Sequence, residues 1–107
     1  MTGKPADGTH ADWTFLTNHA HVLLAIASDP TLRLRDISAI VGVTERTTVG
    51  IISDLEAAGY IRRERVGRRN RYVLDRSRPL RHPREAHHRV GELLEAIEHL
   101  GERGSSR

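Results

Sequence analysis

The segment from Gly42 to Asn70 constrains the fold of this chain more than any other part of the sequence. It reads GVTERTTVGIISDLEAAGYIRRERVGRRN. Gly42 suits the left-handed residue that ends one helix. Thr44 is a good N-cap for a second helix, and Glu45 in the first turn complements the positive end of its dipole. The segment therefore predicts two helices around a tight turn, followed by a stretch rich in arginine.

The spacing of apolar residues gives each helix of the pair one buried face. The first helix is expected over residues 34–41, with buried positions at Leu34, Ile37, Ile40 and Val41. The second helix is expected over residues 44–58 and ends at Gly59. Its buried stripe is Thr48, Ile51, Ile52, Leu55 and Ala58. Two helices joined by about three residues, the second well capped, are typical of a helix-turn-helix.

The opposite face of the second helix carries small and polar side chains. In a helix that docks in the major groove of DNA, such residues meet base edges, and those at the N-terminal end reach phosphates. An exposed Val49 and Gly50 fit a merely solvated helix poorly, because neither residue favours one. We therefore expect DNA contacts from Thr44, Glu45, Arg46, Thr47, Val49, Gly50 and Ser53.

A basic β-hairpin is expected directly after this helix. One strand starts at Tyr60-Ile61 and its partner ends at 72–74, with Gly67 and Asn70 as turn residues. Between residues 60 and 84, ten arginines face two acidic residues, a local balance of +8 in a chain whose net charge is +3. A local field of one sign favours a polyanion partner. Phosphate or minor-groove contacts are expected from Arg63, Arg65, Arg68, Arg69, Asn70 and Arg71. Glu64 is expected to pair across the strands with Arg69 or Arg71.

Helices are expected on both sides of this unit. The first begins near Asp12 or Thr14, has His19 within its apolar stripe, and ends before Asp29-Pro30. A short strand at 31–33 is considered. After a linker at 76–83, a helix at 84–101 has apolar residues close to a 3.5-residue repeat, which favours pairing with a second copy. The expected dimer interface is Phe15, Leu16, His19, Val90, Leu93, Leu94, Ile97 and Leu100. Residues 1–11 and 102–107 are expected to be disordered tails.

Together these elements predict a mostly α fold with a β-hairpin wing, in the order α-α-α-β-β-α, whose residues 12–75 form a winged helix-turn-helix domain. The stretch LRDISAIVGVTERTTVGIISDLEAAGYIRRERVGRRNRY resembles transcription regulators of the MarR and ArsR kind, most of all a small actinobacterial type. The resemblance covers about residues 13–100. It implies a cytoplasmic, homodimeric, sequence-specific regulator that binds double-stranded DNA. MarR proteins also hold small effectors between their helices, so the resemblance also implies a small-molecule effector of unknown identity.

Other features narrow the remaining functions. The chain has no cysteine, which excludes disulfides and thiolate metal sites, and its longest apolar run, at 22–27, is too short to span a membrane. No catalytic motif is present, so neither an enzyme nor a cofactor is expected. A solvated polar face is favoured over a metal site for His88, Glu92, Glu95 and His99 of the last helix. A protein-interaction module and a non-specific architectural DNA-binding protein remain as alternatives.

Overall fold

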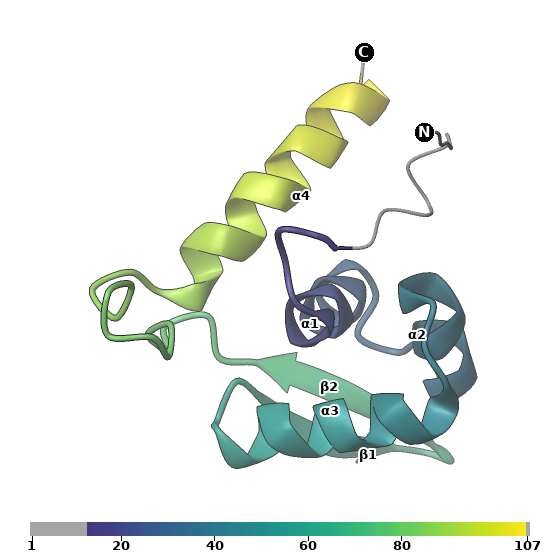
Figure 1. Cartoon of the computed structure of the whole chain (residues 1–107). Helices are drawn as coiled ribbons and strands as arrows, with labels where there is room; N and C mark the ends of the chain where they lie inside the picture. The colour runs from purple at the N-terminus through teal and green to yellow at the C-terminus, as the bar shows by residue number, and fades with distance from the viewer. Residues whose placement is uncertain (1–12, 107) are drawn as a thin grey trace.

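The structure, a computed structural model, describes residues 13–106, with side chains up to residue 98 (Figure 1). Its elements follow the predicted order α-α-α-β-β-α, so the mostly α fold with a β-hairpin is confirmed. The helices and strands are α1 Asn18–Ser28, α2 Leu34–Val41, α3 Glu45–Ala57, β1 Ile61–Val66, β2 Arg69–Leu74 and α4 Val90–Ser106. Within these residues, no helix has the length and apolar composition needed to cross a membrane. The expected tail at 1–11 lies outside the described residues.

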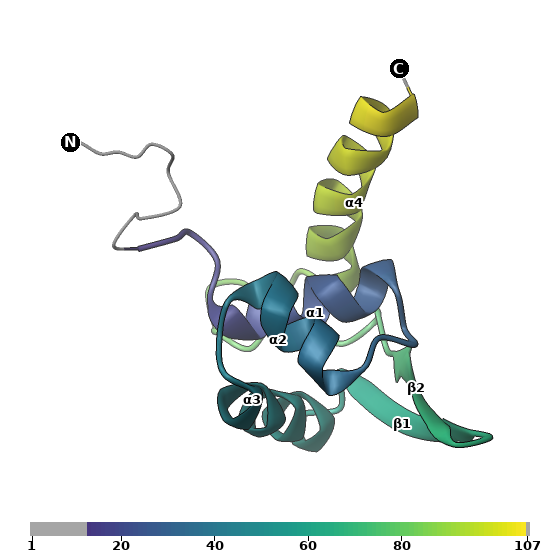
Figure 2. The same cartoon turned by 90° about the vertical axis from the view of Figure 1, so that its right-hand side faces the viewer.

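The core forms around α1. The other three helices pack against this helix, and the hairpin extends from one side of the body while α4 rises away from it (Figure 2). Because α1 has neighbours on several sides, Val22 and Ala25 are buried in addition to Leu23 and Ile26. A single apolar stripe could not predict this burial on two sides. The fully buried side chains are Val22, Ile26, Ile37, Thr48 and Leu94.

The start of α1 differs from the expectation. Thr17 is the N-cap, and its Oγ1 accepts a hydrogen bond from the backbone N–H of Ala20 at 3.2 Å. The predicted start near Thr14 is therefore wrong, because the capping side chain lies three residues further on. The predicted end before Asp29-Pro30 is confirmed. His19 is also not in the core: its side chain is 47% exposed, and Nε2 lies 2.8 Å from Asp54 Oδ2 on α3.

The helix-turn-helix follows the sequence closely. The bounds of α2 agree with the prediction, Gly42 has the left-handed φ of 87°, and Thr44 Oγ1 accepts from the Thr47 N–H at 3.0 Å. One core position was wrong, since Ile40 is 61% exposed and Ser38 is buried instead. The buried side of α2 is centred between Ile37 and Ser38, and Ile40 lies more than a quarter turn from that centre at 100° per residue.

The segment between α1 and α2 contains no strand, so the considered strand at 31–33 is wrong. A turn forms here, in which Asp29 Oδ1 accepts from both the N–H and the hydroxyl of Thr31 at 3.0 and 2.7 Å. A single backbone bond then joins the turn to the hairpin, from the N–H of Tyr72 to the carbonyl of Pro30 at 3.0 Å. This bond places the wing beside the N-terminal end of α2.

The hairpin has a two-residue turn of Gly67 and Arg68, because Val66 pairs with Arg69. Gly67 has a φ of 62°, which this tight turn requires. Asn70 pairs with Arg65 inside the ladder, so its predicted place in the turn is wrong. The register sets Glu64 opposite Arg71, as one predicted pairing required. The predicted pairing of Glu64 with Arg71 across the strands is therefore confirmed, and the carboxylate of Glu64 forms its ion pair with Arg62 of its own strand.

The chain after the wing forms a closed loop instead of a helix. The strand-like bridge between Pro79 and Arg89 closes residues 79–89, hereafter the 79–89 loop. The N–H of Leu80 donates to the carbonyl of His88 at 3.0 Å. The predicted start of the last helix at 84 is therefore wrong, because backbone groups at 82–88 bond within short turns and across the loop base. At its other end α4 continues to Ser106, through the segment expected to be a tail.

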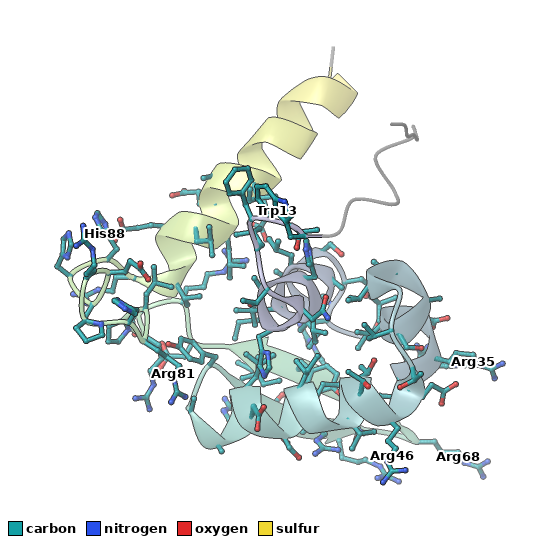
Figure 3. The ribbon with its side chains drawn as sticks, viewed as in Figure 1. Trp13, Arg35, Arg46, Arg68, Arg81 and His88 are labelled. Carbon is teal, nitrogen blue, oxygen red and sulfur yellow. The ribbon has the colours of Figure 1, made fainter. Side chains whose placement is uncertain are left out.

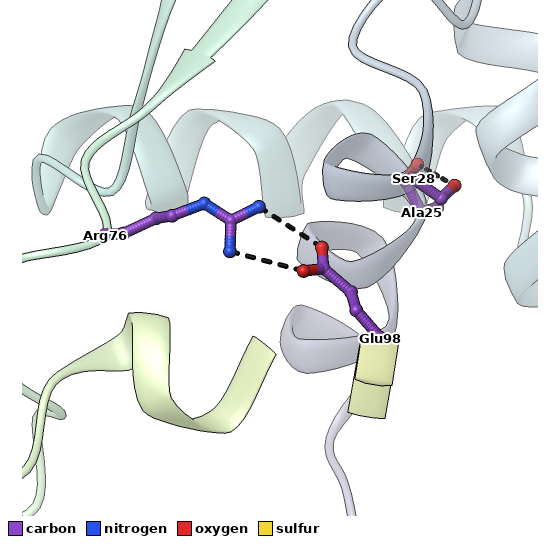
Figure 4. Close-up of polar contacts among 4 residues, drawn as sticks. All are labelled: Ala25, Ser28, Arg76 and Glu98. Atoms are coloured by element: carbon purple, nitrogen blue, oxygen red, sulfur yellow. Dashed lines mark hydrogen bonds and ion pairs between the residues drawn. The ribbon is translucent and has the colours of Figure 1, made fainter. Parts of the chain in front are cut away.

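Arg76, at the exit of the wing, fastens α4 to the body. Its guanidinium donates to both carboxylate oxygens of Glu98, at 3.3 and 3.2 Å (Figure 4). The N–H of Gly91 donates to the Arg76 carbonyl at 2.9 Å. A Cβ at Gly91 would come within 2.8 Å of that carbonyl oxygen, so only glycine permits this close approach. The first turn and the middle of α4 are thus tied to the same residue.

Candidate nucleic-acid interface

The outward face of α3 is the centre of the candidate interface. Arg46, Val49, Gly50 and Ser53 are solvent-exposed, and the side chain of Val49 is 50% exposed. The other side of the same helix is buried against α1 and α2. The fold therefore presents outward the face of α3 whose residues the sequence singled out.

Gly50 has no structural reason to be glycine within the described part of the chain. It lies in the middle of α3 with helical geometry, and a Cβ added there would meet no atom within 4 Å. A glycine inside a helix costs about 1 kcal/mol relative to alanine. The helix thus carries a destabilising residue at the point where its backbone is most accessible from outside.

The N-terminal end of α3 is held by its own side chains. Besides accepting from the Thr47 N–H, the hydroxyl of Thr44 donates to the hydroxyl of Thr47 at 3.0 Å. Thr44 is therefore occupied as the cap, whereas Thr47 retains its own hydroxyl proton for an outside acceptor. Glu45 lies in the first turn and is exposed.

The arginines of the wing fall into two groups. Arg63 donates through Nε and Nη2 to the two carboxylate oxygens of Glu56, at 3.0 and 2.7 Å, and so joins β1 to α3. Arg69 donates to the carbonyl of Thr31 at 2.7 Å, and Arg65 to that of Gly67 at 3.3 Å. In contrast, Arg68 and Arg71 have no ion-pair or hydrogen-bond partner for their side chains in the part of the chain that the structure describes.

Arg35 on α2 belongs with the free arginines and was missed by the sequence reasoning. Figure 3 shows Arg35, Arg46 and Arg68 extending outward on the same side of the molecule, from α2, α3 and the wing respectively. The local excess of positive charge was noted only from residue 60 onward, and a charge count over the helix pair would have found Arg35. We call Arg35, Arg46 and Arg68 the basic face.

A groove of about 400 Å³ separates α3 from the wing. It is lined on one side by Val49 and Ser53 of α3 and on the other by Arg68 and Asn70 of the wing. Its floor includes Tyr72, whose pKa is raised because burial disfavours the phenolate. Neutral and basic groups line this groove, which gives it the chemistry to accept an anionic chain.

The Arg63–Glu56 pair is set for its ionised form. Hydrogen bonds from the guanidinium hold the pKa of Glu56 below the usual 4.5, and the same bonds raise the pKa of Arg63. A carboxyl group whose pKa is lowered by folding stabilises the folded state above its unfolded pKa. That contribution is lost as the pH falls through the folded value.

Replacing Glu56 with glutamine is therefore expected to lower the free energy of unfolding by about 0.5–1 kcal/mol at neutral pH. The deficit relative to wild type should stay constant above pH 4.5 and disappear as acid protonates Glu56 in the wild-type protein. Urea unfolding over a series of pH values measures it. Glu64→Gln, which alters an ion pair within one exposed strand, is the control and should cost less. A deficit that persists at the lowest pH would contradict the assignment.

The residues expected at a dimer interface are divided by the structure. Val90 and Leu94 are 4% and 1% exposed, because the base of α4 packs onto the body of its own chain. Phe15 and Ile97 are 93% and 40% exposed, and Leu93 and Leu16 are half-buried. Trp13 packs edge-on against Phe15 with ring centroids 5.1 Å apart. The side chain of Leu100 lies outside the described residues.

The polar residues considered for a metal do not assemble. His88 precedes α4, and its Nδ1 lies 2.7 Å from Glu92 Oε1. The backbone N–H of Arg89 and this histidine lower the pKa of Glu92. Over the described residues, no group of three or more histidines and carboxylates is placed to hold a metal ion. The side chain of His99 lies outside them.

Two helices around the left-handed Gly42, followed by a β-hairpin beside the second helix, define a winged helix-turn-helix protein. Residues 14–71 match the model of the MarR family. Because this match covers more than half of the chain, the protein belongs to the MarR family.

Two solved structures, those of FabT and MepR, support the fold, and a third is reported with them. Streptococcus pneumoniae FabT in complex with DNA is 17% identical, covers 94% of this chain and 64% of its own, and gives a TM-score of 0.54. MepR, a transcription regulator of the Staphylococcus aureus multidrug efflux pump MepA, is 22% identical over 89% and 62%, with a TM-score of 0.52. The PcaV regulator from Streptomyces coelicolor is 27% identical over 55% and 46%, with a TM-score of 0.48. This chain thus spans less than two thirds of each of their lengths. No curated protein gives a significant match.

Proposed function

We propose that this chain is a sequence-specific DNA-binding transcription regulator that acts in the cytoplasm as a homodimer. The observation that carries the proposal is the open face of α3, where Gly50 weakens the helix without serving any packing within the described structure. A missing side chain at this point lets the backbone approach a partner closely. Membership of the MarR family supports a role in transcription.

The proposed DNA contacts are made by exposed side chains of α2, α3 and the wing. With α3 in the major groove, Arg46 reaches guanine or phosphate, Thr47 and Ser53 offer hydroxyls, and Val49 offers a methyl surface to thymine. Arg68 and Arg71 of the wing lie on the backbone or in the minor groove, and Arg35 reaches the phosphates beside α2. Arg63 and Arg69, which already bind Glu56 and Thr31, position the wing in this proposal.

A homodimer accounts for the exposed apolar residues near α4. Trp13 and Phe15 lie on the segment before α1, and Ile97, which is 40% exposed, lies about 60° around α4 from the buried Leu94, with Leu93 beside it. Pairing these surfaces about a twofold axis buries them and carries two copies of α3 to successive half-sites. The DNA target of such a dimer is an inverted repeat.

Among the described residues, one groove has the size and lining that suit a small-molecule effector. A groove of about 700 Å³ lies between α1, the end of α3 and the base of α4, lined mainly by apolar residues such as Leu23 and Leu94, with His19, Asp54 and Arg81 among its polar residues. An apolar molecule bound here would touch both the DNA-binding body and α4. Binding of such a molecule should raise the melting temperature of the purified protein, which a thermal unfolding experiment measures.

Selection of bound sequences from a random duplex library, at a stated salt concentration, tests the function. The expected product is an inverted repeat with a defined spacing between half-sites. Recovery of random sequence would instead show architectural binding, and absence of binding would favour a protein-interaction module. Both outcomes overturn the proposal.

The selected duplex then allows a sharper test with Gly50→Ala. The variant should be about 1 kcal/mol more stable than wild type, because alanine favours a helix and its Cβ meets open space. Its affinity for the selected duplex should nevertheless fall, because the methyl group separates the helix from the groove. Thermal unfolding and DNA titration measure the two effects. Ala39→Gly, an exposed change on α2, controls for helix propensity alone. A more stable variant with unchanged affinity would exclude close approach at Gly50.

A further inference from the structure

The 79–89 loop is a second concentration of positive charge, at the other end of α3 from the wing tip. Residues 78–89 contain four arginines and one acidic residue, Glu85, together with three histidines. Of these arginines, only Arg78 has an ion-pair partner in the described residues, Asp75 at 3.5 Å. Arg81, Arg84 and Arg89 are exposed. The loop therefore offers several unneutralised guanidinium groups to the solvent.

The backbone of the loop is fixed at both ends. The hydroxyl of Tyr60 donates to the carbonyl of Pro79 at 2.6 Å, and the N–H of Val90 donates to the carbonyl of Arg78 at 2.8 Å. Within the loop, the N–H of Glu85 donates to the carbonyl of His82 at 2.8 Å, which closes a four-residue turn. Arg81 precedes this turn and Arg84 lies within it, so both are carried on an anchored frame.

The exposed face of α3 leads directly to this loop. Ala57 lies eleven residues after Arg46, which at 100° per residue returns it to the same side of the helix. Ala57 and Arg81 line the same groove at the C-terminal end of α3. Figure 3 shows Arg81 beside that end, with Arg46 and Arg68 toward the other. The outward face of α3 thus has arginine at both of its ends.

We propose that Arg81 and Arg84 of the 79–89 loop form a second phosphate-contacting surface for duplex DNA. This inference rests on the proposed docking of α3 in the major groove. A helix of 13 residues is about 20 Å long, longer than the roughly 12 Å width of the groove, so both of its ends lie close to phosphates. The wing and Arg35 serve one end, and the 79–89 loop serves the other. The charge along one continuous face favours one long polyanion over a separate acidic protein.

The first test removes the two charges with Arg81→Ala and Arg84→Ala together. Each lost phosphate contact should reduce the slope of log affinity against log salt by about 0.9. The double variant loses two contacts in each subunit of the proposed dimer, so its slope should fall by about 3.6 and it should bind about 4,000-fold more weakly at 0.1 M salt. The loss should be equal for selected and random duplexes. The charge-preserving variant Arg81→Lys with Arg84→Lys is the control and should keep the slope. An unchanged slope in the alanine variant overturns the proposal.

A second test measures proximity and uses the absence of cysteine from the chain. An iron chelate attached to Arg84→Cys should cleave the bound duplex at sites beside each half-site. The same probe on Glu95→Cys, exposed on α4, should leave the DNA intact. DNA binding without cleavage from position 84 would refute the loop contact alone. Failure of the wild-type protein to bind any duplex would instead refute the proposed function.

Discussion

Replacing Arg68 and Arg71 together with alanine is expected to weaken binding of the proposed dimer to every duplex by about 4,000-fold at 0.1 M salt. Both guanidinium groups lack a partner among the described residues, so their charge is available to phosphates. Loss of two contacts in each subunit should lower the salt slope by about 3.6, while the preferred sequence stays the same. Titration of labelled duplexes at four or more salt concentrations measures slope and affinity together.

The control for this variant lies on the same hairpin. Arg62→Ala removes one arginine that is already paired with Glu64, so its effect on the slope should be much smaller. The strands need not be disturbed in either variant, since Arg62, Arg68 and Arg71 are all exposed. Equal slopes for Arg62→Ala and the double variant would show that the wing acts only as diffuse charge.

Replacing Leu93 and Ile97 together with glutamate is expected to convert the proposed dimer to a monomer. Light scattering should then report the mass of a single chain, 12.0 kDa. Affinity for an inverted repeat should fall by 100-fold or more, because linked binding to two half-sites commonly contributes 10²–10⁴. Affinity for an isolated half-site should change little.

Ala96→Glu is the matched control on the same helix. Ala96 is exposed and lies about 160° around α4 from the buried Leu94, so a carboxylate there should leave the dimer intact. A wild-type protein that is monomeric at micromolar concentration would contradict the dimer directly. Dissociation by Ala96→Glu would place the seam on another side of α4.

Local signals predicted the central part of the fold. Gly42, Thr44 and Gly59 end or start helices through backbone conformation and capping, which depend on neighbouring residues only. The bounds of α2 and α3 and the outer ends of the two strands followed from such signals. Ile40 was placed wrongly because its burial depends on which neighbours pack against the helix. Periodicity alone does not give that direction.

The candidate interface was predicted in its composition and not in its organisation. The sequence identified the outward residues of α3 and the arginines of the wing. It could not show that Arg63 is bound by Glu56, or that Arg35 on another helix joins the basic face, because both depend on tertiary contacts. The 79–89 loop was hidden for a similar reason. The sequence of this loop contains no glycine and resembles the start of a helix. The bridge between Pro79 and Arg89, which shows that the segment is a closed loop, is a tertiary feature.

Because α4 is attached to Arg76, a rotation of this helix is transmitted to the body of the chain. α4 has 17 residues and is therefore about 25 Å long. Its base cannot swivel freely, because Gly91 and Glu98 both hold the residue at which the wing ends. A tilt of about 10° at the far end of such an arm corresponds to a displacement of roughly 4 Å, about one base-pair step of 3.4 Å. In a dimer joined through α4, a small rotation at the seam would be transmitted as a change in the spacing of half-sites that the two subunits can span.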